Sequence, residues 1–314
     1  MKKIKGEITT QQIVLLIILL ASFLIILFLL FRLDIGKQSD SEICHNSIVM
    51  RGNPVLPADA ISLKCSRTYV CITKDGSCEK MTKPEIKKVK TKEEVYNVLA
   101  EEMANCWWMF GEGKVNYVTD TMKKNNYCSI CAQVLFDNSL NEIEGMEENI
   151  NKDEFYNYLS MTPLPEGEMN YAEYFLGTND INKLKEELSN KADKEVGFGT
   201  IKIGEQYFIV MGITSEVNTI GWVIRGAALG GVVVVGLATF GVGTASFAAV
   251  LVGDIAAGVI GAGGAGIADM ISPKIGAIMV DGDGIKNKFM TPTIQGANSE
   301  EFKALNCEEI LTSS

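Results

Sequence analysis

The chain has 314 residues, of which 47% are hydrophobic and 22% are charged, and its 29 Lys and Arg against 39 Asp and Glu give a formal charge of −10. This apolar content excludes a disordered chain, and the absence of a Gly-X-Y period among its 30 glycines excludes a collagen-like one. An acidic chain with dispersed lysines argues against nucleic acid as a partner. Because the chain has a single histidine, a multi-histidine metal site is excluded, and we expect neither a metal nor another cofactor.

Residues 13–31 form an apolar run whose least apolar members are Ala21 and Ser22, and Lys2, Lys3 and Lys5 precede it. As a helix this run would span roughly 28 Å, about the thickness of the hydrocarbon core of a bilayer. A buried core helix and a cleaved secretory signal are the alternatives, but the run is apolar on all sides and lacks a small-residue cleavage site. We therefore predict a transmembrane anchor over residues 13–31, with the basic residues 1–12 in the cytoplasm and most of the chain outside the cell membrane.

The residues ahead of this run carry a more specific pattern. A basic stub ends in Lys5-Gly6-Glu7 and is followed by a short polar stretch that includes Gln11. The first 30 or so residues resemble the leader and first helix of a type IV prepilin of the archaeal kind. The resemblance implies cleavage between Gly6 and Glu7, with Gln11 where many pilins carry a polar residue. The glutamate that bacterial pilins have near this position is missing here.

The region 34–219 is polar and long enough to form a folded domain with its own core. It contains seven of the eight cysteines, and the eighth lies in the tail 272–314. The apolar run 13–31 and a second apolar block, residues 220–271, contain none. An even number of cysteines confined to segments expected outside the cell predicts disulfides in an oxidising compartment, with their connectivity left open. The candidates are Cys44, Cys65, Cys71, Cys78, Cys106, Cys128, Cys131 and Cys307.

Two other uses of these cysteines are weighed against disulfides. Cys128 and Cys131 have the C-x-x-C spacing of a thiol redox motif, but residues 132–136 continue as a strand, without the helix N-terminus that lowers a thiol pKa. A zinc site built on Cys65, Cys71 and Cys78 would lack paired C-x-x-C knuckles. We therefore expect a protein that is not an enzyme, with thiol oxidoreductase as the nearest enzymatic alternative.

Local patterns predict α+β structure in this domain. Residues 67–73 alternate as a strand, and Thr91 with Glu94 forms a capping box that opens a helix ending at Gly111. Cys106 lies on the apolar face of that helix, where it could join the segment of Cys128 and Cys131. Its neighbours Trp107 and Trp108 are expected in the core rather than in an exposed aromatic patch. His45 is expected at the surface rather than as a ligand.

Further along the chain, residues 180–191 are expected to form a short helix. Residues 199–203 and 206–211 flank Gly204-Glu205, a two-residue turn that predicts a β-hairpin. Residues 275–280 are expected to add a third strand to this hairpin.

The block 220–271 holds thirteen glycines and three charged residues, Arg225, Asp254 and Asp269. Soluble helices avoid so much glycine, whereas membrane helices use small residues for close packing. We predict a glycine-rich helical hairpin embedded in the membrane; a buried helical core of a soluble domain and an interfacial or re-entrant segment are the alternatives. Small residues spaced for helix packing are Gly226 and Gly230, and then Gly241, Ala245, Ala249, Gly253, Ala257, Gly261 and Ala265.

Asp254 would then be an intramembrane carboxylate, which is costly unless it faces a partner or water. It could line a proton or ion path, but a position near a helix end or a hydrogen bond inside the hairpin is the favoured interpretation.

Together these patterns predict an α+β, disulfide-stapled extracytoplasmic domain with an N-terminal transmembrane helix and a glycine-rich transmembrane helical hairpin, its tail 272–314 returning to the domain. The expected function is that of a membrane-anchored structural or interaction protein. Its expected partners are the lipid bilayer and other membrane or surface proteins, in a homo- or hetero-oligomer. Two alternatives stay open: a prepilin-like subunit of a surface filament or its apparatus, and a protein that inserts into membranes to form pores or fuse them.

Overall fold

The computed structural model describes residues 10–32, 39–56, 60–118, 126–146, 149–165, 167–192, 195–214, 238–240, 245–252, 274–282, 285, 287–305 and 307–313. The chain divides into two compact units, Met1–Ser39 and Asp40–Ser314.

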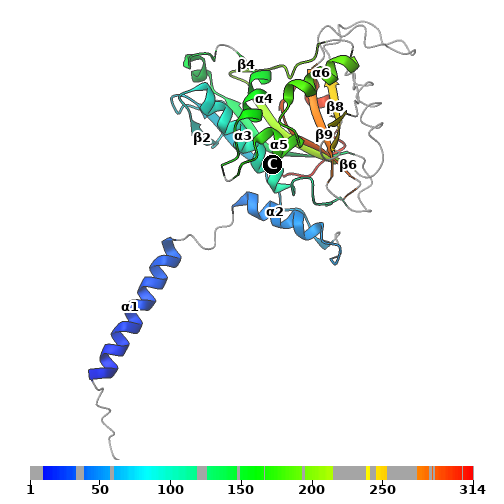
Figure 1. The fold of residues 1–314 in the computed structure, drawn as a ribbon. Coiled ribbons are helices and arrows are strands. Elements are labelled where there is room, and N and C mark those ends of the chain that lie inside the picture. Colours follow the sequence, from blue (N-terminus) through cyan, green and yellow to red (C-terminus); the bar gives the residue numbers. More distant parts are fainter. Residues whose placement is uncertain are drawn as a thin grey trace, which may run out of the picture. The chain divides into compact units, whose positions relative to one another are not determined.

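The first unit contains one long helix, α1 (Thr10–Arg32) (Figure 1). The large hydrophobic side chains from Ile13 to Ile25 are 47% to 63% exposed. Among the residues that the structure describes, no helix combines the length and the apolar character that crossing a membrane requires. This finding overturns the prediction of a transmembrane anchor over residues 13–31 and, with it, of a location in the cell membrane.

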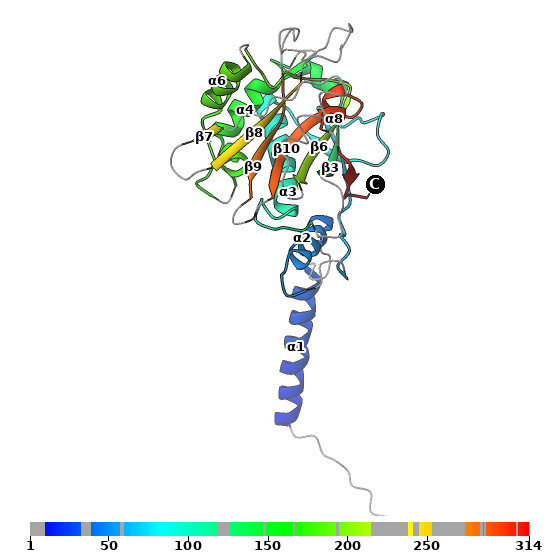
Figure 2. The same cartoon turned by 90° about the vertical axis from the view of Figure 1, so that its right-hand side faces the viewer.

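The second unit is built on a mixed sheet in which the described strands lie in the order β2-β1-β3-β6-β10-β9-β8-β7. Figure 2 shows the part of this order from β3 to β7. The strand β1 runs parallel to both β2 and β3, the remaining neighbours along this order are antiparallel, and the short C-terminal β11 pairs in parallel with β3. The strands are β1 (Thr68–Thr73), β2 (Glu85–Lys88), β3 (Asn126–Phe136), β6 (Gln206–Thr214), β7 (Ala238–Phe240), β8 (Ala245–Val252), β9 (Lys274–Asp281), β10 (Lys288–Gly296) and β11 (Glu309–Ile310).

Helices lie on both faces of this sheet. The largest, α3, packs across β3, β6 and β10 on the face that carries the main core, while α8 packs against β9 and β10 on the other face (Figure 2). A separate two-stranded sheet joins β4 to β5. The bounds are α2 (Asp40–Arg51), α3 (Lys92–Met109), the 3₁₀ helix η2 (Asn138–Glu142), β4 (Asn149–Asn151), α4 (Lys152–Met161), α5 (Tyr171–Leu176), α6 (Ile181–Ala192), β5 (Thr200–Lys202) and α8 (Glu300–Ala304).

The helix α3 forms where its local signals predict it. The Thr91 hydroxyl accepts a hydrogen bond from the backbone N–H of Glu94 at 3.2 Å, and the Glu94 carboxylate accepts one from the backbone N–H of Lys90 at 2.6 Å. The first bond satisfies an amide donor of the first turn that has no partner within the helix, and the second ties the residue ahead of the cap to the same turn. At its end, Gly111 adopts a φ of +79°, a conformation that glycine takes without strain. The strand at 67–73 and the helix at 180–191 are likewise present, as β1 and α6.

The predicted membrane-embedded helical hairpin is wrong where the structure describes it. Residues 245–252 form β8, which pairs with β9 and β7. The four-residue spacing of small residues does not distinguish a helix from a strand, because residues four apart lie on one face of either element. The spacing of Ala245 and Ala249 is therefore compatible with both. The remaining residues proposed for helix packing lie outside the described residues, as does Asp254: Gly226, Gly230, Gly241, Gly253, Ala257, Gly261 and Ala265.

The predicted hairpin around Gly204-Glu205 is also corrected. Gly204 has the positive φ expected of the turn, +84°, but β5 pairs with β4 whereas β6 lies between β3 and β10. The predicted third strand exists as β9, separated from β6 by β10. The turn therefore connects a strand of the small sheet to a strand of the large sheet, and a pocket lies beside the turn.

Candidate functional site

All eight cysteines form disulfides, as the sequence predicts. The bond Cys106–Cys131 joins α3 to β3, and Cys128–Cys307 joins β3 to the C-terminal segment. The other two are Cys44–Cys65 and Cys71–Cys78. Such pairing is typical of proteins that fold in an oxidising environment.

The two cysteines of the C-x-x-C pair do not bond to each other. Cys131 belongs to the main core and Cys128 to the core on the opposite face of the sheet, because residues three apart in a strand point to opposite sides. Each therefore bonds to a different element. Because every cysteine is in a disulfide, no free thiol is present to act as the nucleophile of a thiol oxidoreductase. For the same reason no thiol is present to bind zinc.

The single histidine and the paired tryptophans pack against other side chains. Trp107 is 3% exposed and meets the ring of Phe289 edge-on. The ring of His45 stacks on Trp108 with centroids 4.1 Å apart, and its Nδ1 lies 2.7 Å from the Trp108 carbonyl oxygen. The predicted core role of Trp107 is thus confirmed, and His45 is half-buried against Trp108.

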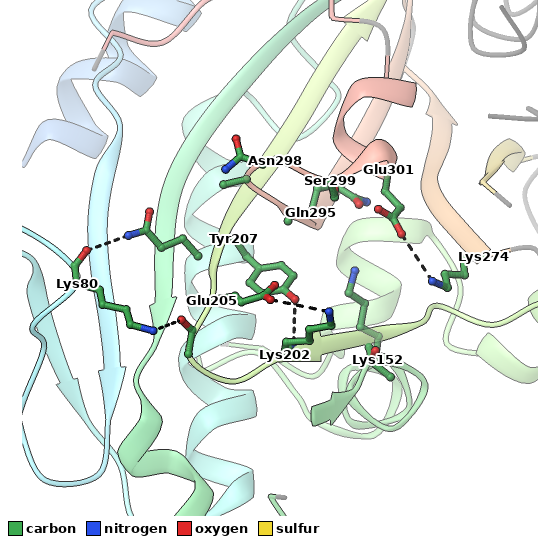
Figure 3. A pocket seen from close by; sticks show the side chains of 15 residues that line it. Lys80, Lys152, Lys202, Glu205, Tyr207, Lys274, Gln295, Asn298, Ser299 and Glu301 are labelled. Carbon is green, nitrogen blue, oxygen red and sulfur yellow. Dashed lines mark hydrogen bonds and ion pairs between the residues drawn. The ribbon is translucent and has the colours of Figure 1, made fainter. Parts of the chain in front are cut away.

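A cavity of about 630 Å³ lies beside the turn after β5 (Figure 3). Its walls come from the start of α4, the turn between β5 and β6, the start of β9, the end of β10 and the start of α8. We call it the lysine pocket, after the residues that distinguish it. Its charged lining residues are Lys80, Lys152, Lys202, Lys274, Glu205 and Glu301.

The half-buried Lys152 reaches the pocket from the first position of α4. The side chain of the preceding residue, Asn151, caps this helix by accepting from the backbone N–H of Asp153 at 2.8 Å. The Lys152 Nζ donates to the carbonyl oxygen of Ile294 at 2.6 Å. A cation at a helix N-terminus is opposed by the helix dipole, so this position costs stability rather than adding to it.

The carbonyl that Lys152 uses belongs to a part of β10 that has separated from β9. Backbone pairing between these strands covers only residues 288–290 of β10, and Pro292 has no N–H to extend it. Beyond that point the hydroxyls of Thr291 and Thr293 donate to carbonyl oxygens of β9, at 3.1 and 3.0 Å. The opening between the two strands is therefore filled by side chains, and it ends at the pocket.

The four lysines are held in two different ways. Lys80 and Lys152 donate to backbone carbonyls, the former to that of Gly204 at 2.9 Å. Lys274 lies 3.7 Å from Glu301, and Lys202 lies 3.9 Å from Glu205 (Figure 3). Four lysines against two glutamates leave the pocket with an excess of positive charge.

Burial sets the electrostatics of Lys152. It lowers the pKa of the Lys152 ammonium to about 8, since a charged group loses hydration there. Glu301 opposes this shift, and Lys274 adds to it. A fraction of the Lys152 side chains is therefore uncharged near neutral pH.

The approach of Lys274 to the pocket depends on a glycine. Gly199 has a φ of +82°, and a Cβ built on it would lie 3.1 Å from the Lys274 Cδ. The missing side chain thus leaves room for the lysine stem.

None of the pocket residues is predicted as a site by the sequence. The lysines come from segments spread between Lys80 and Lys274, so no local spacing connects them. Of the residues predicted for leader processing, Gln11 lies in α1, and Gly6 and Glu7 lie outside the described residues.

Comparisons with protein-family models, with curated proteins and with solved structures gave no significant match.

Proposed function

We propose that the protein is a non-enzymatic interaction protein of an oxidising compartment, and that it binds an anionic ligand in the lysine pocket. One observation carries this proposal: Lys152 places an ammonium in a cavity wall where a carbonyl, rather than a carboxylate, is its hydrogen-bond partner.

The energetics of Lys152 support an anionic ligand. An ammonium has three donors, and its burial is unfavourable when no carboxylate is hydrogen-bonded to it. A carboxylate or phosphate in the pocket would supply charge-assisted hydrogen bonds to Lys152 and to Lys274 beside it. The exposed Lys80 and Lys202 would attract such an anion from solution.

Calorimetric titration with citrate and with inorganic phosphate tests this proposal. We expect binding that weakens as salt is added, and a loss of roughly tenfold or more in affinity for Lys152→Gln. The matched control is Lys114→Gln, which removes a lysine paired with Glu112 away from the pocket. Equal affinity of the Lys152 variant and the wild type would contradict the proposal.

The exposed apolar surface of α1 favours a second candidate function, that of a filament subunit. Side chains as large as Leu16, Phe23 and Leu24 stay more than half exposed in the single chain. Burial of a Leu or Phe side chain contributes about 1.5–3 kcal/mol, so packing of α1 against other copies would be strongly favoured. The resemblance of residues 1–31 to a prepilin points to the same kind of assembly.

This second candidate predicts a processed N-terminus. N-terminal sequencing of the protein from its native source should then give a chain that begins at Glu7, and electron microscopy should show polymers. A chain that keeps Met1 and stays dispersed would refute it.

A further inference from the structure

We infer that Lys152 is a nucleophile that forms an imine with a small oxo acid, an aldehyde or ketone that also carries a carboxylate, bound in the lysine pocket. This inference rests on the proposed anion binding and names the chemical class of the ligand.

The position of Lys152 meets the geometric need of a nucleophile. Its side chain lines the cavity, and a hydrogen bond to the Ile294 carbonyl orients the Nζ. In Figure 3 the Lys152 amine points into the same space as Glu301 and Lys274. A volume of about 630 Å³ admits a small organic acid beside these three side chains.

The electrostatic surroundings make the free amine available. Imine-forming lysines in proteins are activated by loss of hydration or by a neighbouring cation. Both effects act on Lys152: burial and the neighbouring Lys274 lower its pKa to about 8, although Glu301 opposes the shift. The other charged groups that line the pocket are Glu301 of α8, Lys202 and Glu205 beside the turn, and the exposed Lys80.

The remaining lysines explain why the carbonyl compound should be an acid. A carboxylate paired with Lys274 would bring the carbonyl carbon on the next atom towards Lys152. An uncharged aldehyde would lack this anchor, and an acid without a carbonyl group would bind without reacting.

The proposed step is a condensation. The lone pair of the Lys152 nitrogen attacks the carbonyl carbon, and a C–N bond forms as the C–O π bond breaks. The nitrogen gives up its two protons, which pass through water or the Glu301 carboxylate to the former carbonyl oxygen. This oxygen leaves as water when its remaining C–O bond breaks and the nitrogen lone pair forms the C=N π bond. No electron is transferred, and hydrolysis reverses the step.

Reductive trapping provides the experiment. The full-length protein is incubated with pyruvate and sodium cyanoborohydride at pH 7.4, and the carboxyethylated lysines are identified by peptide mass spectrometry. We expect Lys152 to be labelled first, at least roughly tenfold faster than ordinary surface lysines, because far more of its amine is uncharged. Its labelling rate should rise as the pH approaches 8 and then level off.

Two comparisons separate the possible outcomes. Citrate should protect Lys152 from labelling, and Lys152→Arg should lose the fast label that Lys114→Arg retains. Because the label is mapped in the wild-type chain, the result does not depend on the folding of any variant.

Labelling spread evenly over the lysines would overturn the inference. If citrate still binds in that case, the proposed anion binding stands alone; if citrate does not bind, both proposals fail.

Discussion

Lys152 is an electrostatic liability in the folded protein, and this has a measurable consequence. Its pKa is about 8 in the folded chain against 10.5 as the ordinary value, so the unfolded chain holds more protons between these two pH values. The stability of the wild type should therefore rise with pH across this window.

Replacing Lys152 by methionine removes this titration. At pH 7, Lys152→Met should be more stable than the wild type by at most about 3 kcal/mol, and the advantage should vanish near pH 10.5. Urea unfolding of both proteins at several pH values measures the difference. A constant difference at all pH values would show that Lys152 does not titrate as described.

Glu102 on α3 presents the opposite case, since burial raises the pKa of its carboxyl to about 7. Glu85 and Glu101 add to the rise, and Lys87 opposes it. The folded chain therefore holds more protons than the unfolded chain between about 4.5 and 7, and stability is lost as the pH rises through that window.

The variant Glu102→Gln keeps the shape of the side chain and cannot ionise. We expect it to exceed the wild type in stability at pH 8 by up to about 3 kcal/mol and to match it near pH 4. Unfolding measurements at these two pH values decide the matter. No gain at pH 8 would mean that the carboxylate is well solvated.

Among the elements, α3 depends most clearly on its own sequence. Replacing the capping residue Thr91 by alanine should cost about 1 kcal/mol, because the Glu94 N–H then loses its acceptor. Thr91→Ser keeps a hydroxyl and should restore most of the stability. Thermal unfolding followed by circular dichroism makes the comparison, and equal losses in the two variants would argue against capping.

The elements that the sequence predicts well carry local signals. The cap at Thr91 and the alternation at 67–73 act within a few residues, so α3 and β1 follow from neighbouring side chains. The strand β8 has no such local signal, because its hydrogen-bond partners lie about thirty residues away in β9. The spacing of its small residues fits a helix as well as a strand, and only the pairing with β9 makes it a strand.

The candidate site forms only through the tertiary structure, so no local sequence signal predicts it. Lys152 and Lys274 line one pocket because backbone pairing between β9 and β10 covers only residues 288–290 of β10, and because Gly199 leaves room for the Lys274 stem. Each residue is ordinary in its own segment. The disulfide Cys128–Cys307 is hidden for a similar reason, since it joins residues 179 apart.

For the whole molecule, the disulfides differ greatly in the length of chain that they close. Cys128–Cys307 spans 179 residues and Cys71–Cys78 spans 7. Chain-entropy estimates predict that loss of the long link destabilises the protein by about 2–3 kcal/mol more than loss of the short one. Guanidinium unfolding of the two double Cys→Ser variants tests this, and equal losses would show that the unfolded state is not a free coil.

The disulfide pattern also decides what a cut in the chain would release. The overlapping bonds Cys106–Cys131 and Cys128–Cys307 enclose every peptide bond from Cys106 to Cys307, so a nick anywhere in that span leaves both fragments on one molecule. All eight cysteines lie after Ser39 and pair with one another. One scission ahead of Asp40 would therefore separate α1 from the unit that bears the lysine pocket, and would leave all four disulfides of that unit intact.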